Sequence, residues 1–388
     1  MTERSLLMIP GPINFDPAVL RVLSTPTLSH MSPSFAEIFR EVLSNLRKVT
    51  FTENAQPLVL AGSGTLAMET ALTNLIERGD EALAVDNGHF GARSAEILRS
   101  YGVKVDELRY RWGTAARPED IREKLEQKSY KLVTVTHVDT STGCRNDVEA
   151  IGSVVRDFDA LLVVDGVCAT AAEPERIDEW GIDVLITASQ KALGVPPGLA
   201  IVFFSEVALE AYRARRNPVE SYFVSLDRWL PIMRSYEEER ALYFATPPVN
   251  LILALRRSLE LILGEGMENV FARHGVVAEA FRSAVKALGL KMVPERDEYA
   301  ANTMTAVYYP GGVEDGEFRG GMAERGVTVA GGLGTLKGKI FRVGHMGSVN
   351  AHDILATIGA MEATLEELGH NVEVGRGLAQ AQKILNRM

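Results

Sequence analysis

Cysteine is scarce in this chain of 388 residues, which contains only Cys144 and Cys168. Two cysteines so far apart in the sequence exclude a disulfide framework and a CxxC pair. Free thiols in a protein of this size are typical of a reducing compartment. The sequence therefore predicts a cytoplasmic protein.

Long hydrophobic runs and an excess of positive charge are also lacking. No stretch of about 18 apolar residues without charges occurs, so no membrane span is expected. The apolar run within Met1–Pro10 is too short for a secretory signal. The net charge is −10, from 41 Lys and Arg against 51 Asp and Glu, which argues against binding to nucleic acid or anionic lipid. The expected partners are small molecules and other protein chains.

Metal-binding patterns are absent too. The seven histidines contain no HExxH motif and no pair four residues apart, so no metal site is predicted. His89 and His137 each follow a predicted strand. We interpret both as supporting groups near a site, with contact to a substrate as the less favoured alternative.

Short apolar runs alternate with longer amphipathic stretches between residues 57 and 205, which is typical of βα units that build a parallel sheet. The pattern therefore predicts an α/β fold with a large, doubly wound, mostly parallel sheet. The predicted strands are 57–61, 81–85, 103–108, 131–136, 160–164, 184–187 and 199–204, and the predicted helices between them are 66–77, 92–100, 118–128 and 147–156.

The pattern changes after residue 205. A charged helix over 206–216 leads into a segment with few regular features, which continues to Pro248. We expect an N-terminal arm (1–20), a large domain (21–264) and a smaller C-terminal α+β domain (265–388). Beyond 248 the predicted helices are 249–263, 267–288, 315–325 and 351–368, and the predicted strands are 303–309, 327–330 and 339–343.

Gly62-Ser63-Gly64-Thr65 lies between a predicted strand and a predicted helix. Glycines let backbone amides approach an anion, hydroxyls donate hydrogen bonds, and a helix N-terminus carries partial positive charge. The turn therefore has the composition of a phosphate site. The alternative is a βα turn capped by its own hydroxyls, with no ligand.

Two charged residues follow later strands of the predicted sheet. Asp165 ends the run Leu161–Val164, where burial would raise its pKa unless a cation pairs with it. Lys191 follows the strand 184–187 in a sequence rich in Ala, Gly and Pro, where burial would free its amine as a nucleophile. Taken singly, each fits a turn residue. Together with the phosphate turn they predict pyridoxal 5′-phosphate, which has a phosphate, a ring nitrogen and an aldehyde.

From Met8 to about Gly347 the chain resembles the class V aminotransferases, which have the fold-type I architecture of pyridoxal-phosphate enzymes. Within that family it resembles the alanine–glyoxylate and serine–pyruvate aminotransferase group. Eight blocks in the family's order carry the resemblance: Gly11-Pro12, Gly62–Thr65, Asn87–Arg93, Thr136–Gly143, Val164-Asp165, Ser189–Lys191 with Pro196–Gly198, Tyr243–Pro247, and Gly331–Gly334 with Phe341–Gly344.

The resemblance implies a role for each matching residue. Lys191 would form the Schiff base with the cofactor and Asp165 would pair with its ring nitrogen. Phe90 would stack on the ring, where relatives often have Trp, and Ser141 or Thr142 would bond near it. The phosphate would be held by Ser63, Gly64, Thr65 and Gln190, joined by Tyr243 and Thr246 from the partner subunit of a homodimer with shared active sites.

The same resemblance implies that Arg342 binds the substrate carboxylate and that the arm residues Gly11 and Pro12 line the substrate pocket. Relatives often read Gly-Pro-Gly-Pro in this arm, where the chain has Ile13 and Asn14 after Gly11-Pro12. This departure leaves the choice of amino acid open. No cysteine follows Cys168, which argues against a cysteine desulfurase.

The predicted activity is transamination of a small amino acid, L-alanine or L-serine, with glyoxylate or pyruvate. No second arginine stands out in the sequence for a distal carboxylate. The alternatives are another amino donor, such as an aminophosphonate or a purine-breakdown amine, and a pyridoxal-phosphate lyase or epimerase. A non-enzymatic protein that keeps the cofactor fold is the least favoured, because binding alone does not need Lys191, Asp165 and Arg342 together.

Overall fold

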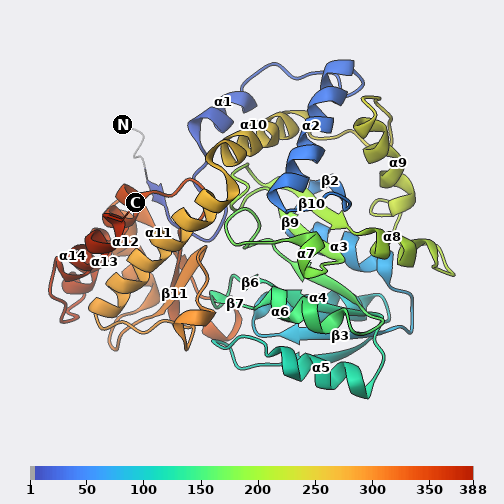
Figure 1. The fold of residues 1–388 in the computed structure, drawn as a ribbon. Coiled ribbons are helices and arrows are strands. Elements are labelled where there is room, and N and C mark those ends of the chain that lie inside the picture. The colour runs from blue at the N-terminus through green and yellow to red at the C-terminus, as the bar shows by residue number, and fades with distance from the viewer. Residues whose placement is uncertain (1–4, 388) are drawn as a thin grey trace.

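A seven-stranded sheet forms the centre of the computed structural model, which describes residues 5–387 (Figure 1). The strand order is β2-β10-β9-β8-β5-β3-β4; β10 runs antiparallel to both its neighbours, and the remaining pairs in this sheet are parallel. The mostly parallel arrangement confirms the predicted fold class. The strands are β2 (Gln56–Gly62), β3 (Glu81–Asp86), β4 (Lys104–Arg109), β5 (Leu132–Thr136), β8 (Leu161–Asp165), β9 (Val184–Ala188) and β10 (Gly198–Phe204).

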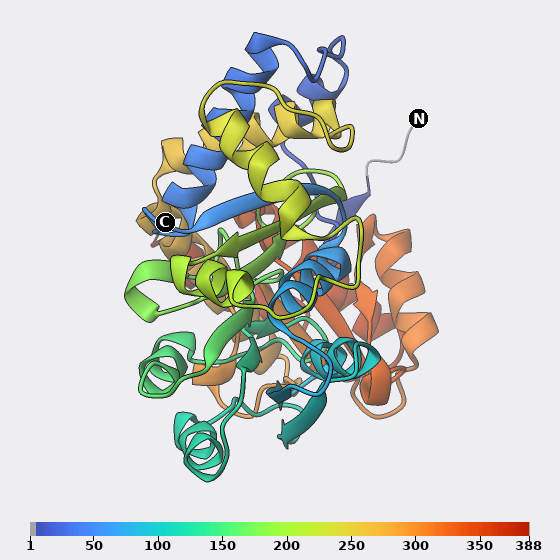
Figure 2. The same ribbon diagram turned by 90° about the vertical axis from the view of Figure 1, so that its right-hand side faces the viewer.

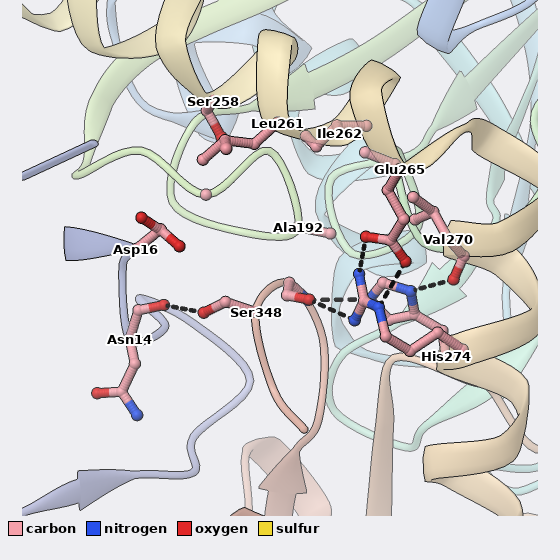
Figure 3. Close-up of a pocket in the computed structure, with 14 residues that line it drawn as sticks. Asn14, Asp16, Ala192, Ser258, Leu261, Ile262, Glu265, Val270, His274 and Ser348 are labelled. Atoms are coloured by element: carbon pink, nitrogen blue, oxygen red, sulfur yellow. Dashed lines mark hydrogen bonds and ion pairs between the residues drawn. The ribbon is translucent and has the colours of Figure 1, made fainter. Parts of the chain in front are cut away.

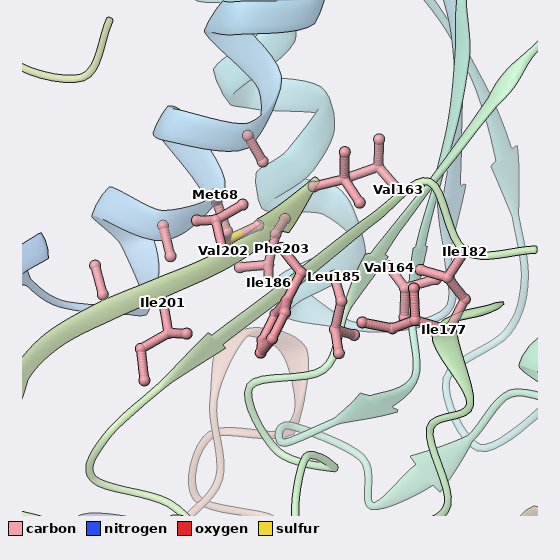
Figure 4. Packing of buried hydrophobic residues seen from close by; sticks show 14 of the residues in the cluster. Met68, Val163, Val164, Ile177, Ile182, Leu185, Ile186, Ile201, Val202 and Phe203 are labelled. Carbon is pink, nitrogen blue, oxygen red and sulfur yellow. The ribbon is translucent and has the colours of Figure 1, made fainter. Parts of the chain in front are cut away.

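Helices cover both faces of this sheet. Figure 2 shows α3 (Gly64–Leu75) and α4 (His89–Ser100) on one side and α5 (Pro118–Gln127) and α6 (Val148–Val155) on the other. Strands β5, β8 and β9 are buried along their whole length, as expected for strands that lack polar alternation. Met68 of α3 packs among the apolar side chains of the middle strands (Figure 4). A ligand can therefore reach this sheet only where the strands end.

The remaining helices near the sheet include four that the sequence pattern does not predict, over residues 17–23, 33–49, 177–180 and 226–237. The pattern predicts an irregular segment up to Pro248, but α9 forms within it and has Pro231 in its interior. Proline removes one backbone hydrogen bond from a helix, and here the buried Trp229 and Met233 hold the helix against the core. These helices are α1 (Pro17–Leu23), α2 (Pro33–Val49), α7 (Ile177–Trp180), α8 (Glu206–Arg213), α9 (Leu226–Glu237) and α10 (Val249–Glu265).

A second, smaller hydrophobic cluster lies around the antiparallel sheet β11-β14-β13. Gly266, with φ 85°, separates α10 from α11, close to the predicted domain boundary; the domain limits themselves stay a prediction. The helix α14 was not predicted. The elements are α11 (Met267–Ala287), η1 (Asp297–Tyr299), β11 (Met304–Tyr308), α12 (Asp315–Glu324), β12 (Val327–Thr328), β13 (Ala330–Gly331), η2 (Gly334–Leu336), β14 (Ile340–Gly344), α13 (Ala351–Glu367) and α14 (Arg376–Leu385).

The start of the chain joins this smaller part. Strand β1 (Leu6–Leu7) pairs in parallel with β12, and the Gly344 amide donates a hydrogen bond of 2.9 Å to the carbonyl of Met8. The hairpin β6 (Val138–Asp139) and β7 (Cys144–Arg145) lies beyond the end of β5. Within residues 5–387, no helix combines the length and the apolar character that crossing a membrane requires.

Glu362 of α13 is expected to be a main support of α14. It is fully buried, and its carboxylate accepts hydrogen bonds from the amides of Gly375 (2.8 Å), Gly377 (2.6 Å) and Leu378 (3.3 Å). Glu362→Gln is expected to lower the free energy of unfolding by about 1–3 kcal/mol, because buried donors lose a charged acceptor. Urea unfolding measures the loss. The exposed Glu366→Gln in the same helix is the control, and equal stability of the two variants would contradict this role.

Candidate functional site

One cavity collects half of the predicted site residues at the edge where β2, β5, β8 and β9 end. It brings together Ser63, Gly64, Thr65, Phe90, Asp165, Gln190 and Lys191, all of which the sequence singles out. Residues that were not singled out complete the lining: Met68, Arg93, Val138, Thr140, Val167 and Cys168.

The first wall of the cavity is the start of α3. Ser63 precedes the helix without a side-chain capping bond, so its hydroxyl and the first helical amides are available to a ligand. A Cβ atom at Gly64 would lie 3.0 Å from a methyl group of Val167, so this position has little room for a side chain. The side-chain oxygen of Gln190 is buried and has no hydrogen-bond partner among the described residues. The composition and the free polar groups fit a bound phosphate.

Asp165 forms the base of the cavity at the end of β8. Burial raises the pKa of its carboxyl to about 7, and the nearby charges of Asp139 and Glu175 act in the same direction. The Val167 amide donates a hydrogen bond of 3.0 Å to Oδ1, which partly opposes the shift. A protonated ring nitrogen would supply the missing positive charge.

Lys191 lies in the loop that follows β9 and is buried. Burial lowers the pKa of its amine, and the positive charge of Arg342 lowers it further. The amine donates a hydrogen bond to the carbonyl oxygen of Pro10 in the N-terminal arm. A buried amine with a lowered pKa is suited to attack an aldehyde and to accept a proton.

Gly11 of the same arm packs directly on Lys191. Its φ is +107°, and a Cβ atom would lie 2.6 Å from Cδ and 2.8 Å from Nζ of the lysine. Gly11→Ala is expected to lower turnover about tenfold or more, because the methyl group must displace the reactive amine. Steady-state rates at saturating cofactor measure the effect. Gly79→Ala is the control, since Gly79 also has positive φ (+92°) but no atom within 4 Å of the added methyl group; an equal loss in both variants would contradict the steric argument.

Arg342 enters the site region from β14. Its Nε donates to the carbonyl of Gly331 (2.7 Å) and its Nη1 to the carbonyl of Thr140 (2.9 Å). Burial lowers the pKa of this guanidinium, which nevertheless remains charged at neutral pH. Among residues 5–387 the remaining Nη2 group has no hydrogen-bond partner, so it is free for a substrate carboxylate.

Ser141 and Thr142 do not line the cavity, although the resemblance implies that one of them bonds near the ring. The Ser141 hydroxyl donates to Asp139 Oδ1 at 2.5 Å, and the Thr142 hydroxyl accepts a hydrogen bond from the amide of Cys144 at 3.2 Å. Both side chains therefore stabilise the turn itself. The residue that faces the cavity from this loop is Thr140.

Asp139 is a support that sequence reasoning missed. It is fully buried, and its Oδ2 accepts the amides of Phe90 (2.8 Å) and Gly91 (3.3 Å) at the start of α4. Through Oδ1 it also holds the turn that carries Thr140. Asp139 thus fixes both the Phe90 backbone and the carbonyl that binds Arg342. The only available signal was its place within the block Thr136–Gly143.

Tyr243 and Thr246 are not part of the cavity lining within this chain. The Tyr243 side chain is 59% exposed, and its ring centroid lies 5.5 Å from that of His30. Tyr222, Phe223 and Leu242 are also exposed. That Tyr243 and Thr246 complete the site of a partner subunit stays a prediction.

Neither of the two histidines that follow strands lines the cavity. His89 Nε2 lies 3.1 Å from Nη2 of Arg93, so it supports a lining residue. The buried His137 pairs through Nδ1 with Glu175 at 2.9 Å and borders a different hollow. Their placement agrees with supporting roles. No group of three His, Cys, Asp or Glu residues arranged to hold a metal ion is found in the described part of the chain.

A second cavity borders the loop after Lys191, next to Ala192 and Gly194 (Figure 3). Its polar groups are largely bonded to one another. His274 bonds through Nδ1 to the Val270 carbonyl (2.7 Å) and through Nε2 to the Gly347 amide (2.9 Å), and the Ser348 hydroxyl donates to the Asn14 carbonyl (3.1 Å). The Ser348–Asn14 hydrogen bond in this cavity connects the N-terminal arm to the smaller part of the chain.

The family model described as "Aminotransferase class-V" matches residues 20–349. Alanine–glyoxylate aminotransferase 1 of Saccharomyces cerevisiae is 41% identical over 357 residues, which cover 88% of this chain and 91% of the yeast protein. The L-aspartate–glyoxylate aminotransferase of Paracoccus denitrificans is 36% identical over 389 residues, covering 99% and 96%.

A solved structure agrees with these relatives. The ureidoglycine–glyoxylate aminotransferase of Bacillus subtilis superposes with a TM-score of 0.94 at 33% identity, covering 100% of this chain and 99% of that one. The similarity therefore extends over the N-terminal arm, the large sheet and the smaller C-terminal part.

Proposed function

Because the chain belongs to the class V aminotransferase family, we propose that it uses pyridoxal phosphate to transfer an amino group from L-alanine or L-serine to glyoxylate or pyruvate. The observation that carries this proposal is the single cavity in which the start of α3, Asp165 and Lys191 meet. An anion site, a buried carboxylate and a buried amine are the three groups that this cofactor requires.

Each part of the cofactor has matching residues in the chain. Ser63, Gly64, Thr65 and Gln190 would hold the phosphate, Phe90 the ring face and Asp165 the ring nitrogen. Lys191 would attach the aldehyde carbon. When bound, the cofactor supplies an aldehyde that takes up amino groups and a ring that accepts an electron pair.

Two residues would act on protons. The carboxylate of Asp165 would keep a proton on the ring nitrogen, because a buried negative charge favours a positive partner. The Nζ of Lys191 would take the proton from the donor's α-carbon. Burial lowers the pKa of Lys191, which favours the neutral amine that this step needs.

The substrate carboxylate would bind Arg342, whose guanidinium is fixed by two backbone carbonyls. Such an anchor accepts any α-amino acid or 2-oxo acid, so it does not select the donor. The names of the relatives support glyoxylate as the acceptor, since the alanine–, L-aspartate– and ureidoglycine–glyoxylate aminotransferases are all named for it. The same names differ in the donor, which keeps other amino donors as the main alternative.

The assembly belongs to the same proposal. We place the enzyme in the cytoplasm as a homodimer in which Tyr243 and Thr246 of each subunit reach the phosphate site of the other. The exposed aromatic side chains around Tyr243 support a contact there. An active monomer on size-exclusion chromatography would contradict the shared site.

The visible spectrum of the purified protein tests the activity. After reconstitution with pyridoxal phosphate, L-alanine or L-serine alone is expected to remove the visible absorption band, and glyoxylate is expected to restore it. A band that is indifferent to both amino acids would contradict the proposed donors. Consumption of amino acid without any 2-oxo acid would indicate a lyase or epimerase instead.

A further inference from the structure

Arg93 lines the cofactor cavity but has no part in the proposed function as described so far. It lies in the first half of α4, three residues after Phe90. The cavity therefore contains a second cationic side chain besides Lys191. A charge placed beside a phosphate turn requires an explanation.

Three contacts fix the position of this guanidinium. Its Nη1 donates to the hydroxyl of Thr65 at 3.3 Å, and its Cζ lies 4.7 Å from the centroid of the Phe90 ring. Its Nη2 lies 3.1 Å from Nε2 of His89, which must accept because a guanidinium only donates. The side chain is thus held between the predicted ring-stacking residue and the predicted phosphate turn.

Within residues 5–387 no carboxylate forms an ion pair with Arg93. Arg99 of the same helix, in contrast, pairs with Glu107. A cation that lines a cavity without a counter-ion favours an anionic ligand. The contact with Thr65 places that anion at the α3 end of the cavity, where a helix N-terminus also favours negative charge.

We propose that Arg93 binds the phosphate of the cofactor and provides the positive charge that the backbone amides and hydroxyls of residues 63–65 do not. This inference rests on the proposed function. Arginine suits the role because its planar fork donates two hydrogen bonds to a phosphate. The stacking on Phe90 reduces the freedom of the side chain before the ligand arrives.

The test compares two cofactors that differ only in the phosphate. Dissociation constants of pyridoxal phosphate and of pyridoxal are measured by visible absorption for the wild type, Arg93→Gln and Arg93→Lys. For Arg93→Gln we expect pyridoxal phosphate to bind about 10- to 100-fold more weakly and pyridoxal to change less than about threefold. Arg93→Lys keeps the charge without the fork, so an intermediate loss is expected. Arg99→Gln, on the same helix, is the matched control.

Several outcomes would overturn this proposal. An equal loss for both cofactors would show that Arg93 acts on the ring through Phe90. Unchanged binding of both, together with a raised KM for L-aspartate, would assign Arg93 to a substrate carboxylate. A wild type that binds neither cofactor would instead reject the proposed function, on which this inference rests.

Discussion

Replacing Lys191 with alanine is expected to lower the transamination rate at least about 1000-fold. In the proposed mechanism the substitution removes both the covalent attachment of the cofactor and the base that takes the α-proton, and general acid–base catalysis alone contributes about 10²–10⁴-fold. The rate is measured with L-alanine and glyoxylate at saturating cofactor. The variant is also expected to release pyridoxal phosphate on dialysis under conditions in which the wild type retains it.

The Lys191→Arg variant tests whether attachment of the cofactor and proton transfer need the lysine amine itself or only a positive charge. Arginine keeps a positive charge near Pro10 but neither attacks an aldehyde nor loses a proton at neutral pH. Its activity is therefore expected to be as low as that of Lys191→Ala, whereas added methylamine is expected to restore part of the rate in the alanine variant only. Turnover close to the wild-type rate in either variant would remove Lys191 from the mechanism.

Replacing Asp165 with asparagine is expected to lower turnover about 100- to 1000-fold. Asparagine fills the same volume but carries no charge, so the proton on the ring nitrogen loses its partner and the ring withdraws electrons less strongly. The effect is expected in kcat rather than in the KM for the donor, because Arg342 still binds the carboxylate. An unchanged kcat would contradict the pairing of Asp165 with the ring nitrogen.

The stability of the cofactor-free protein provides an independent check on Asp165. Its pKa is raised by burial to about 7, above the value of about 4 expected in the unfolded chain. The folded protein therefore holds a proton that the unfolded chain releases, so this group's contribution to stability falls as the pH rises from about 4 to 7. Asp165→Asn is expected to abolish that decline. Thermal unfolding of the wild type and of Asp165→Asn between pH 4 and 7 measures this effect on stability separately from any effect on activity.

The sheet and the ends of its strands follow directly from the sequence. Apolar runs such as Leu161–Val164, alternating with amphipathic stretches, favour buried parallel strands, and polar residues directly after such strands are expected to meet at one edge. This reasoning places Asp165, Lys191 and Ser63–Thr65 in one cavity, as the structure shows. The common location of these residues could therefore be predicted from the sequence.

Other parts of the site depend on geometry that a sequence pattern does not contain. In the turn after β5, a difference of one residue decides whether Thr140 or Ser141 faces the cavity, and the buried carboxylate of Asp139 fixes that choice. The contact of Arg93 with Thr65 joins two successive helices, α3 and α4, and the sequence pattern does not predict which side chains meet there. Likewise, α9 forms despite Pro231 because buried tertiary contacts outweigh the local helix propensity.

The pairing of β1 with β12 sets an order of events during synthesis. Leu6 and Leu7 are translated long before their partners Val327 and Thr328, which follow more than 300 residues later. Pro10 and Gly11 lie in the segment that follows β1. The Pro10 carbonyl accepts a hydrogen bond from Lys191, and Gly11 packs on the same side chain. The large sheet can thus form while the chain is still growing, but Lys191 acquires its final surroundings only after residues 327–328 have been translated.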